Sequence, residues 1–515
     1  MSGRLPILLF LLGSLATPLP ASGVGTGADT TVAGRTYALL SATDLMAQLR
    51  EARKPIHLRE KAVTGPLYAP SVGLDTVRVA LYLEDVLFFD EVNLNKVVFL
   101  APLRGERAVF AGGLSLLGAR FRDDFALRES HSARHFNFKQ ARFDSAVDLS
   151  AGHFAESISF IETHFGGQAR FDRCTFGAAA YFEKARFADS GNFRDAHFTG
   201  VASFKDVVWT GDAVFAGARF DQRVLFWRAH FNRAADFAAV RADGEASFNG
   251  MVCSGRADFT DFTFAQNAHF ADTAFDRAAF AGAYFRKVAD FSGVAARTLR
   301  LKAFFNHELD LRHAVVGTLD LRRGANADST FADAARIYLS QGYFDRILVR
   351  WATLRGHLAI ADSSSLAALE PTYAALRHQF LRRGLTGDAE HCQIERLEHE
   401  RQALTWSEPK RWTMELWHKS SHYGTNPTRL VISILSFILL FGLIYRLSAH
   451  AMRPAYGEGS PTLADCIGFS IHIFTRAGYR AWHATGHLKL LVSVEALVGW
   501  ISLALLIAVV LANLL

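Results

Sequence analysis

An eleven-residue repeat in the middle of the chain restricts the fold more than any other feature of this sequence. Ten consecutive lines of eleven fill residues 163–272, from THFGGQARFDR to FTFAQNAHFAD, and the ninth position is Phe in all ten. The third position is Phe in seven lines and Trp209 in one, and the seventh is Ala in eight. Large residues therefore alternate at spacings of six and five, which fits neither a helix nor a simple strand. A short fixed period of this kind is typical of a solenoid.

The repeat also predicts which side chains form the core. A large residue and the small residue two positions before it point inward, and the residue between them points outward. Each such segment forms one side of a coil, so two lines of eleven make a four-sided coil of 22 residues. An irregular Phe-rich β domain is the alternative. The core side chains are expected to stack in columns, and they are Phe160, Phe165, Phe171, Phe176, Phe182, Phe187, Phe193, Phe198, Phe204, Trp209, Phe215, Phe220, Phe226, Phe231 and Phe237.

This pattern resembles the pentapeptide-repeat family in its Phe-rich variant. The resemblance is strong from Phe138 to Phe291, and weaker echoes such as ELDLRHAVVGTLDLRRG extend it over residues 56–360. It implies a right-handed quadrilateral β-helix. Residues 163–272 hold 12 Lys/Arg and 13 Asp/Glu, so we expect neither an acidic mimic of DNA nor a nucleic-acid partner. A protein partner on the solenoid surface is the remaining expectation for this part of the chain.

Metal, cofactor and enzyme chemistry are not expected. Several His precede a Phe, but an offset of 22 residues pairs His153 with Thr175 rather than with another His. The four cysteines form no CxxC pair and are interpreted as small buried residues rather than as a disulfide frame or a zinc site. The chain also lacks GxSxG, Walker and HExxH motifs in a convincing context.

The N-terminal residues predict export. In residues 1–23 one Arg precedes an apolar core, Leu5 to Ala16, which is followed by small residues. This is the pattern of a secretory signal peptide, and an uncleaved anchor is the alternative. Residues 24–55 are interpreted as an N-terminal linker and cap.

Helices are predicted after the repeat. A helical hairpin over residues 361–407 is expected to cap the solenoid, because an exposed apolar coil end needs a cover. Its apolar positions recur at helical spacing and are Leu366, Leu369, Tyr373, Leu376, Phe380, Ile394, Leu397 and Leu404. Residues 408–428, preceded by Trp406, carry Trp412 and Trp417 among Lys and Arg, which favours an interfacial segment. An ordinary amphipathic surface helix is the alternative.

Residues 429–515 are predicted to form a two-span membrane domain. Leu430 to Tyr445 and Leu490 to Leu515 are apolar runs that can cross a membrane as helices. Between them Thr462 to Phe474 forms an apolar helix that is too short to cross. A pair of buried helices in a soluble protein is the alternative.

The order of span, short helix, Gly-Tyr loop and span is similar to the pore domain of two-helix potassium channels. VEALVGW of the second span, which contains Glu495 and Gly499, also matches the pattern of pentapeptide-repeat proteins that carry this pore domain. The resemblance implies a mixed fold in which an α-helical membrane domain with a re-entrant pore helix follows the β-helix. It also implies a homotetramer in contact with membrane lipid.

The filter itself departs from the family pattern. Its positions are Thr475, Arg476, Ala477, Gly478, Tyr479 and Arg480, of which Gly478 and Tyr479 match the potassium filter. Arg476 stands at the first Thr of the filter, and Arg480 replaces the second Gly. Fixed cations in a pore favour anions and repel K⁺. We therefore expect a channel-type protein without potassium selectivity, with a non-conducting membrane-anchored scaffold as the alternative.

Orientation and the role of Glu495 complete the predictions. If the signal peptide acts, the solenoid lies in the periplasm of a bacterium and the two spans cross the inner membrane. The short helix then enters from the cytoplasm, inverted relative to a potassium channel and similar to an ionotropic glutamate receptor. Glu495 is expected either to reach the membrane edge or to pair with Arg476 or Arg480.

Overall fold

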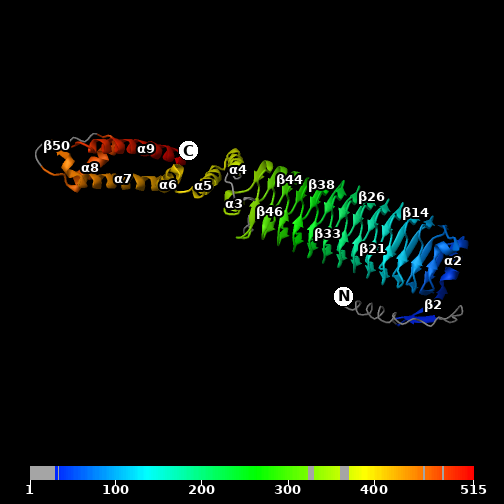
Figure 1. Ribbon diagram of the computed structural model, residues 1–515. Coiled ribbons are helices and arrows are strands. Elements are labelled where there is room, and N and C mark those ends of the chain that lie inside the picture. Colours follow the sequence, from blue (N-terminus) through cyan, green and yellow to red (C-terminus); the bar gives the residue numbers. More distant parts are fainter. Residues whose placement is uncertain are drawn as a thin grey trace. The chain divides into compact units, whose positions relative to one another are not determined.

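The computed structural model describes two compact units, which are treated separately below (Figure 1). They comprise Met1–Ser363 and Ser364–Leu515. The residues described are 29–32, 34–322, 330–359, 370–455, 459–477 and 481–514. The predicted signal peptide, residues 1–23, lies outside this range.

The first unit begins with a strand pair that leads into the solenoid. β1 (Asp29–Val32) pairs in antiparallel fashion with β2 (Arg35–Ser41). β2 then pairs in parallel with β4 (Lys61–Thr64) of the first coil. The residues interpreted as a linker and cap therefore already contribute two strands to a solenoid sheet.

A helix closes the N-terminal end of the solenoid (Figure 1). α2 (Ala42–Glu51) begins after Ser41, whose hydroxyl accepts a hydrogen bond from the backbone N–H of Thr43. Leu45 and Leu49 of α2 are buried and line the apolar interior of the first coils. The helix thus covers the coil end that would otherwise face water.

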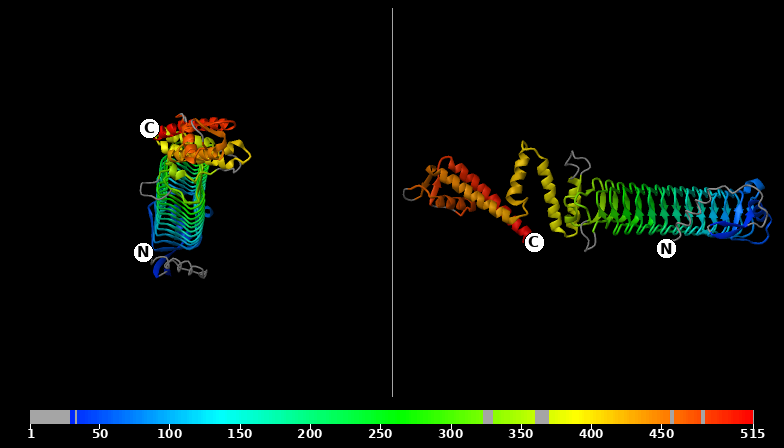
Figure 2. Two further views of the ribbon diagram at one scale, coloured as in Figure 1. Left: turned by 90° about the vertical axis from the view of Figure 1, so that its left-hand side faces the viewer. Right: turned by 90° about the horizontal axis from the view of Figure 1, so that it is seen from below.

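Parallel strands of successive coils stack into three sheets, as Figures 1 and 2 show. One sheet has 14 strands, from β1 to β45 (Phe304–Phe305), and another has 13, from β5 (Leu67–Tyr68) to β48 (Arg336–Tyr338). The third has 22 strands because it contains two sides of the coil, which merge where β34 (His230–Phe231) and β35 (Ala235–Asp236) both pair with one long strand. One strand per coil in the 13-stranded sheet corresponds to about 13 coils.

The strand register confirms the predicted coil of 22 residues over most of the repeat. β20 (His153–Phe154), β24 (Thr175–Phe176) and β28 (His197–Phe198) pair so that Phe154 faces Phe176 and Phe176 faces Phe198. Most strands here are only two residues long, because a turn follows each side of the coil.

Later coils are shorter than predicted. Phe264 pairs with Phe285, an offset of 21 residues, and Phe285 pairs with Phe305, an offset of 20. The register first shifts between Cys253 and Arg256, where one strand continues around a corner. The strands that replace the corner turn are β38 (Val252–Asp258), β41 (Ala274–Ala279), β44 (Ala295–Arg300), β47 (Val315–Asp320) and β49 (Tyr343–Leu348).

Columns of aromatic rings fill the solenoid. Each of the fifteen core residues named above is at most 1% exposed. Phe193 stacks between Phe171 and Phe215 at centroid distances of 4.7 and 4.8 Å, and the same arrangement recurs along the axis. Gly191 stands at a position where the repeat usually has Ala. A Cβ at this position would lie 2.6 Å from Nε1 of Trp209, which explains the glycine.

One prediction about the surface histidines is wrong. His153 does pair with Thr175, but on its other side it pairs with His131, and the two imidazole rings lie 6.0 Å apart. Burial lowers the pKa of both rings, so the pair is neutral near pH 7. His131 lies before residues 163–272, where the repeat is regular, so the sequence pattern did not reveal this neighbour.

The second unit is helical. Tyr373, Leu376 and Phe380 of α4 are buried in a hairpin with α5, whereas Leu366 and Leu369 lie outside the described residues. Capping of the solenoid by this hairpin stays a prediction. Among the described residues, the helices besides α2 are α3 (Trp351–Leu354), α4 (Glu370–Arg382), α5 (Thr386–Ala403), α6 (Pro409–Ser421), α7 (Pro427–Leu447), α8 (Leu463–Thr475) and α9 (Leu488–Leu514), with short 3-10 helices η1 (Ala69–Val72) and η3 (Ala449–Ala451).

Candidate functional site in the apolar helices

α7 and α9 are long and apolar enough to cross a membrane. The qualifying segments are Pro427–Leu447 and Leu488–Leu511, and only 28% and 17% of them is buried within the chain. A core helix of a soluble protein would be mostly covered, whereas these two expose large apolar side chains. They include Val431, Ile432, Leu435, Leu439, Leu440, Leu443, Leu490, Leu497, Ile501, Leu505, Ile507 and Leu511.

The shorter helix α8 packs against both α7 and α9 through glycines. A Cβ on Gly442 of α7 would lie 2.9 Å from Cγ1 of Ile467. A Cβ on Gly499 of α9 would lie 2.4 Å from the carbonyl oxygen of Phe474. Because neither glycine has a side chain, the backbone of α8 approaches both neighbours closely.

Glu495 links the three helices. Its carboxylate accepts a hydrogen bond from the Tyr445 hydroxyl of α7 at 2.5 Å and another from the Ser470 hydroxyl of α8. The Ser470 hydroxyl also lies 3.0 Å from the carbonyl oxygen of Ile438. Glu495 is 0% exposed, so the interpretation as a residue that reaches the membrane edge is wrong.

Of the two predicted arginine partners of Glu495, Arg476 does not pair with it, and Arg480 lies outside the described residues. The Arg476 guanidinium lies over the ring of Trp500, 5.1 Å from its centroid. Its backbone ends α8 in the left-handed region, with φ 54°, and its N–H caps the helix. Neither Tyr445 nor Ser470 was predicted, although each is a hydroxyl in an otherwise apolar run.

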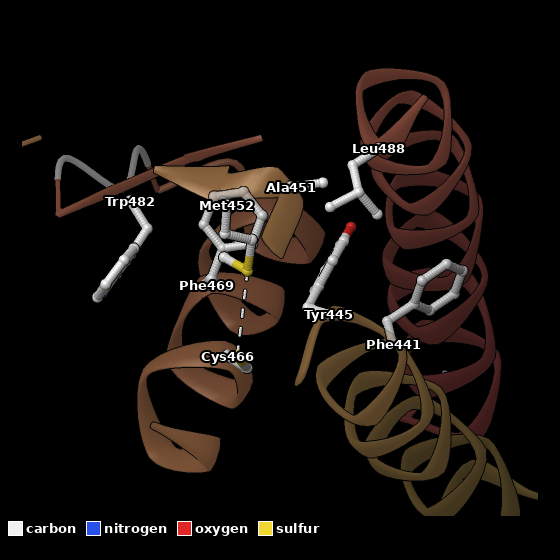
Figure 3. Close-up of a cluster of buried hydrophobic side chains, with 8 residues drawn as sticks. All are labelled: Phe441, Tyr445, Ala451, Met452, Cys466, Phe469, Trp482 and Leu488. Atoms are coloured by element: carbon white, nitrogen blue, oxygen red, sulfur yellow. Dashed lines mark hydrogen bonds between the residues drawn. The ribbon is translucent and has the colours of Figure 1, made fainter. Parts of the chain in front are cut away.

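The segment that contains α8 begins and ends at the same end of the α7–α9 pair. β50 (Met452–Pro454), before α8, pairs in antiparallel fashion with β51 (Trp482–Ala484), after it. At this end a buried cluster joins all these elements, as Figure 3 shows. Its members are Phe441, Tyr445, Ala451, Met452, Cys466, Phe469, Trp482 and Leu488.

The predicted filter is described only in part. The hydroxyl of Thr475 donates to the Ile471 carbonyl at 2.7 Å, and Arg476 and Ala477 follow at the end of α8. Ala477 donates its N–H to the His472 carbonyl. Gly478, Tyr479 and Arg480 lie outside the described residues.

The solenoid carries a polar groove near its N-terminal coils. Its volume is about 590 Å³, and its lining includes His57, Tyr82, Arg104, Asp124 and Arg170. Two of its lining residues, Arg104 and Asp124, form an ion pair of 2.9 Å. Stacking of the imidazole of His57 on Tyr82, with centroids 4.6 Å apart, adds a flat aromatic surface.

Comparison with known proteins identifies the repeat. The family model of pentapeptide repeats (9 copies) matches residues 153–197 and 193–241. No curated protein and no solved structure matches the chain. The protein thus carries a pentapeptide-repeat solenoid, followed by helices of which two are long and apolar enough for membrane anchoring.

Proposed function

We propose that this is a channel-type integral membrane protein with a large pentapeptide-repeat domain outside the bilayer. α7 and α9 span the membrane, and α8 with the loop after it lines a pore between copies. The observation that carries the proposal is the path of the chain at α8. The segment between α7 and α9 begins at β50 and returns at β51, which pair with each other. Between them α8 runs along α9, so that Phe474 near its C-terminal end lies against Gly499, well inside α9.

The exposed apolar faces support insertion and assembly. Residues such as Leu435, Leu439 and Leu497 are 55%, 56% and 62% exposed in a single chain. Lipid tails or further copies of the chain must cover such faces. A homotetramer satisfies this need and surrounds one axis with four α8 helices.

The charge at the end of α8 argues against potassium selectivity. Arg476 ends the helix and carries a guanidinium group. With Arg480, four copies would bring eight positive charges to the loop. Such charges favour anions over K⁺.

The orientation follows from the predicted export signal. The solenoid would lie in the periplasm, with α7 and α9 in the bacterial inner membrane and α8 entering from the cytoplasm. A reporter enzyme fused after Gly324 that folds only in the periplasm should be active. Activity of a cytoplasm-only reporter at the same position would reverse this orientation.

The polar groove of the solenoid supports the alternative function of a non-conducting scaffold. Tyr82, Arg104 and Asp124 offer aromatic and charged contacts to another protein. This alternative requires membrane anchoring but no pore. Neither function involves catalysis, a cofactor or nucleic acid.

Recording from purified full-length protein in planar bilayers separates the two functions. Wild-type tetramers, verified by chemical cross-linking, should give discrete currents. Gly499→Ala should abolish them, because its Cβ meets the Phe474 backbone and displaces α8. Gly387→Ala in α5 is the matched control, since its Cβ meets nothing within 4 Å. Silent membranes that contain wild-type tetramers would favour the scaffold.

A further inference from the structure

A cluster of metal-ligating side chains lies outside the apolar helices, between α5 and α6. Glu398 comes from α5, and His418 comes from the last turn of α6. His422 follows as the C-cap of α6, and its ring centroid lies 5.5 Å from that of His418. One ligand atom from each of the three side chains lies within 4.8 Å of the other two.

The contact between His418 and Glu398 is close but not aligned as a hydrogen bond. Nδ1 of His418 lies 2.7 Å from Oε1 of Glu398. Nevertheless this buried nitrogen has no aligned hydrogen-bond partner among the described residues. A metal ion bound by both atoms would give each of them a partner, since the two do not form a well-aligned hydrogen bond.

A neighbouring arginine orients the Glu398 carboxylate. Arg401 donates to Oε2 of Glu398 at 2.7 Å. The other oxygen, Oε1, is the one that lies close to His418.

We propose that Glu398, His418 and His422 bind one divalent transition metal of the zinc class. Two imidazole nitrogens and one carboxylate oxygen form a ligand set common for Zn²⁺, with a fourth position left for water. Hard cations such as Mg²⁺ and Ca²⁺ prefer sites made entirely of oxygen and fit poorly.

The position of the site suggests what the metal does. His422 lies four residues before Asn426, whose side chain caps the N-terminus of α7. The Ser433 hydroxyl of α7 contacts the Ser420 carbonyl of α6 at 2.9 Å. A metal that joins Glu398 to His422 would therefore fasten α5 to the segment where the chain begins its first apolar helix. This role is independent of whether the protein conducts ions.

Metal binding by the full-length protein in detergent tests the proposal. After treatment with a chelator, titration with Zn²⁺ should show one site per chain, and Co²⁺ should give the absorption bands of a four-coordinate ion. His418→Ala and His422→Ala should each weaken Zn²⁺ binding at least ~100-fold, more than loss of an outer-shell contact. Glu398→Gln should weaken it as well, with little change in side-chain volume.

His399→Ala is the matched control. His399 also lies on α5, but its partner is Glu395 at 4.0 Å and it is not part of the cluster. This variant should keep wild-type affinity, and circular dichroism should show equal helix content in all metal-free variants. Failure of folded wild-type protein to bind Zn²⁺ would overturn the proposal. Unchanged binding by the double variant His418→Ala/His422→Ala, or equal affinity for Mg²⁺, would also overturn it.

Discussion

Replacing Phe182 by Ala should destabilise the solenoid strongly. The Phe182 ring is fully buried and stacks between Phe160 and Phe204, at 4.8 and 4.9 Å. It also meets the edge of Phe193 at 5.2 Å. A Phe→Ala change in a core costs ~3–5 kcal/mol, and several aromatic contacts are lost together, which favours the upper part of that range.

The neighbouring Tyr181 provides the control. Its side chain points outward and is 36% exposed, so Tyr181→Ala removes a ring of similar size from the surface. Its cost should stay below ~1 kcal/mol, the span of strand propensities. The two changes therefore differ only in the side of the strand from which the ring is removed.

Hydrogen–deuterium exchange of peptides from residues 160–240 measures this difference in the solenoid alone. A loss of 4 kcal/mol in the free energy of local opening corresponds to a roughly 10³-fold faster exchange of protected amides. Tyr181→Ala should change the rates by less than about tenfold. Equal acceleration by the two variants would refute the assignment of Phe182 to the core.

Three further changes test other contacts. Glu495→Leu should lower the thermal stability of the helical unit more than Glu495→Gln, because Leu leaves the buried Tyr445 hydroxyl without an acceptor, at ~1–3 kcal/mol, while Ser470 keeps the Ile438 carbonyl; equal melting temperatures would contradict this role. Gly191→Ala should cost ~1–3 kcal/mol by overpacking against Trp209, and unchanged amide exchange nearby would argue against that packing. The hydrogen bond with Asp290 raises the pKa of His269 and burial lowers it, and the net pKa lies above 6.5. The stability from protonated His269 is thus complete below pH 6.5 and is lost as pH rises through the raised pKa. His269→Gln should remove this decline, and a persisting decline would mean that another group causes it.

Most of the solenoid could be predicted because its repeat reports packing directly. One residue in each five or six must fill the interior, so the spacing of Phe determines the coil length and the strand register. The shortening of later coils was missed although a signal was present. Phe275 and Phe280 are five residues apart, where six were expected, and the long strand β41 connects them around the corner.

The contacts within the helical unit were harder to predict. Apolar length was enough to place α7, α8 and α9 close to their observed bounds, since charged or capping residues mark both ends of α7 and of α8. The partners of Glu495 depend on how three helices cross, and no spacing within one helix specifies that. One hypothesis paired Glu495 with Arg476 or Arg480 on charge, whereas the position of Arg476 at the end of α8 brings it over the ring of Trp500.

The most direct test of the proposed function is the reversal potential of the native protein in a planar bilayer with a KCl gradient. The arginines at the loop should exclude K⁺, so the reversal potential should lie between zero and the chloride equilibrium potential. The double variant Arg476→Thr/Arg480→Gly should move the reversal potential toward the potassium value. A native current that reverses near the potassium equilibrium potential would contradict the role assigned to the two arginines.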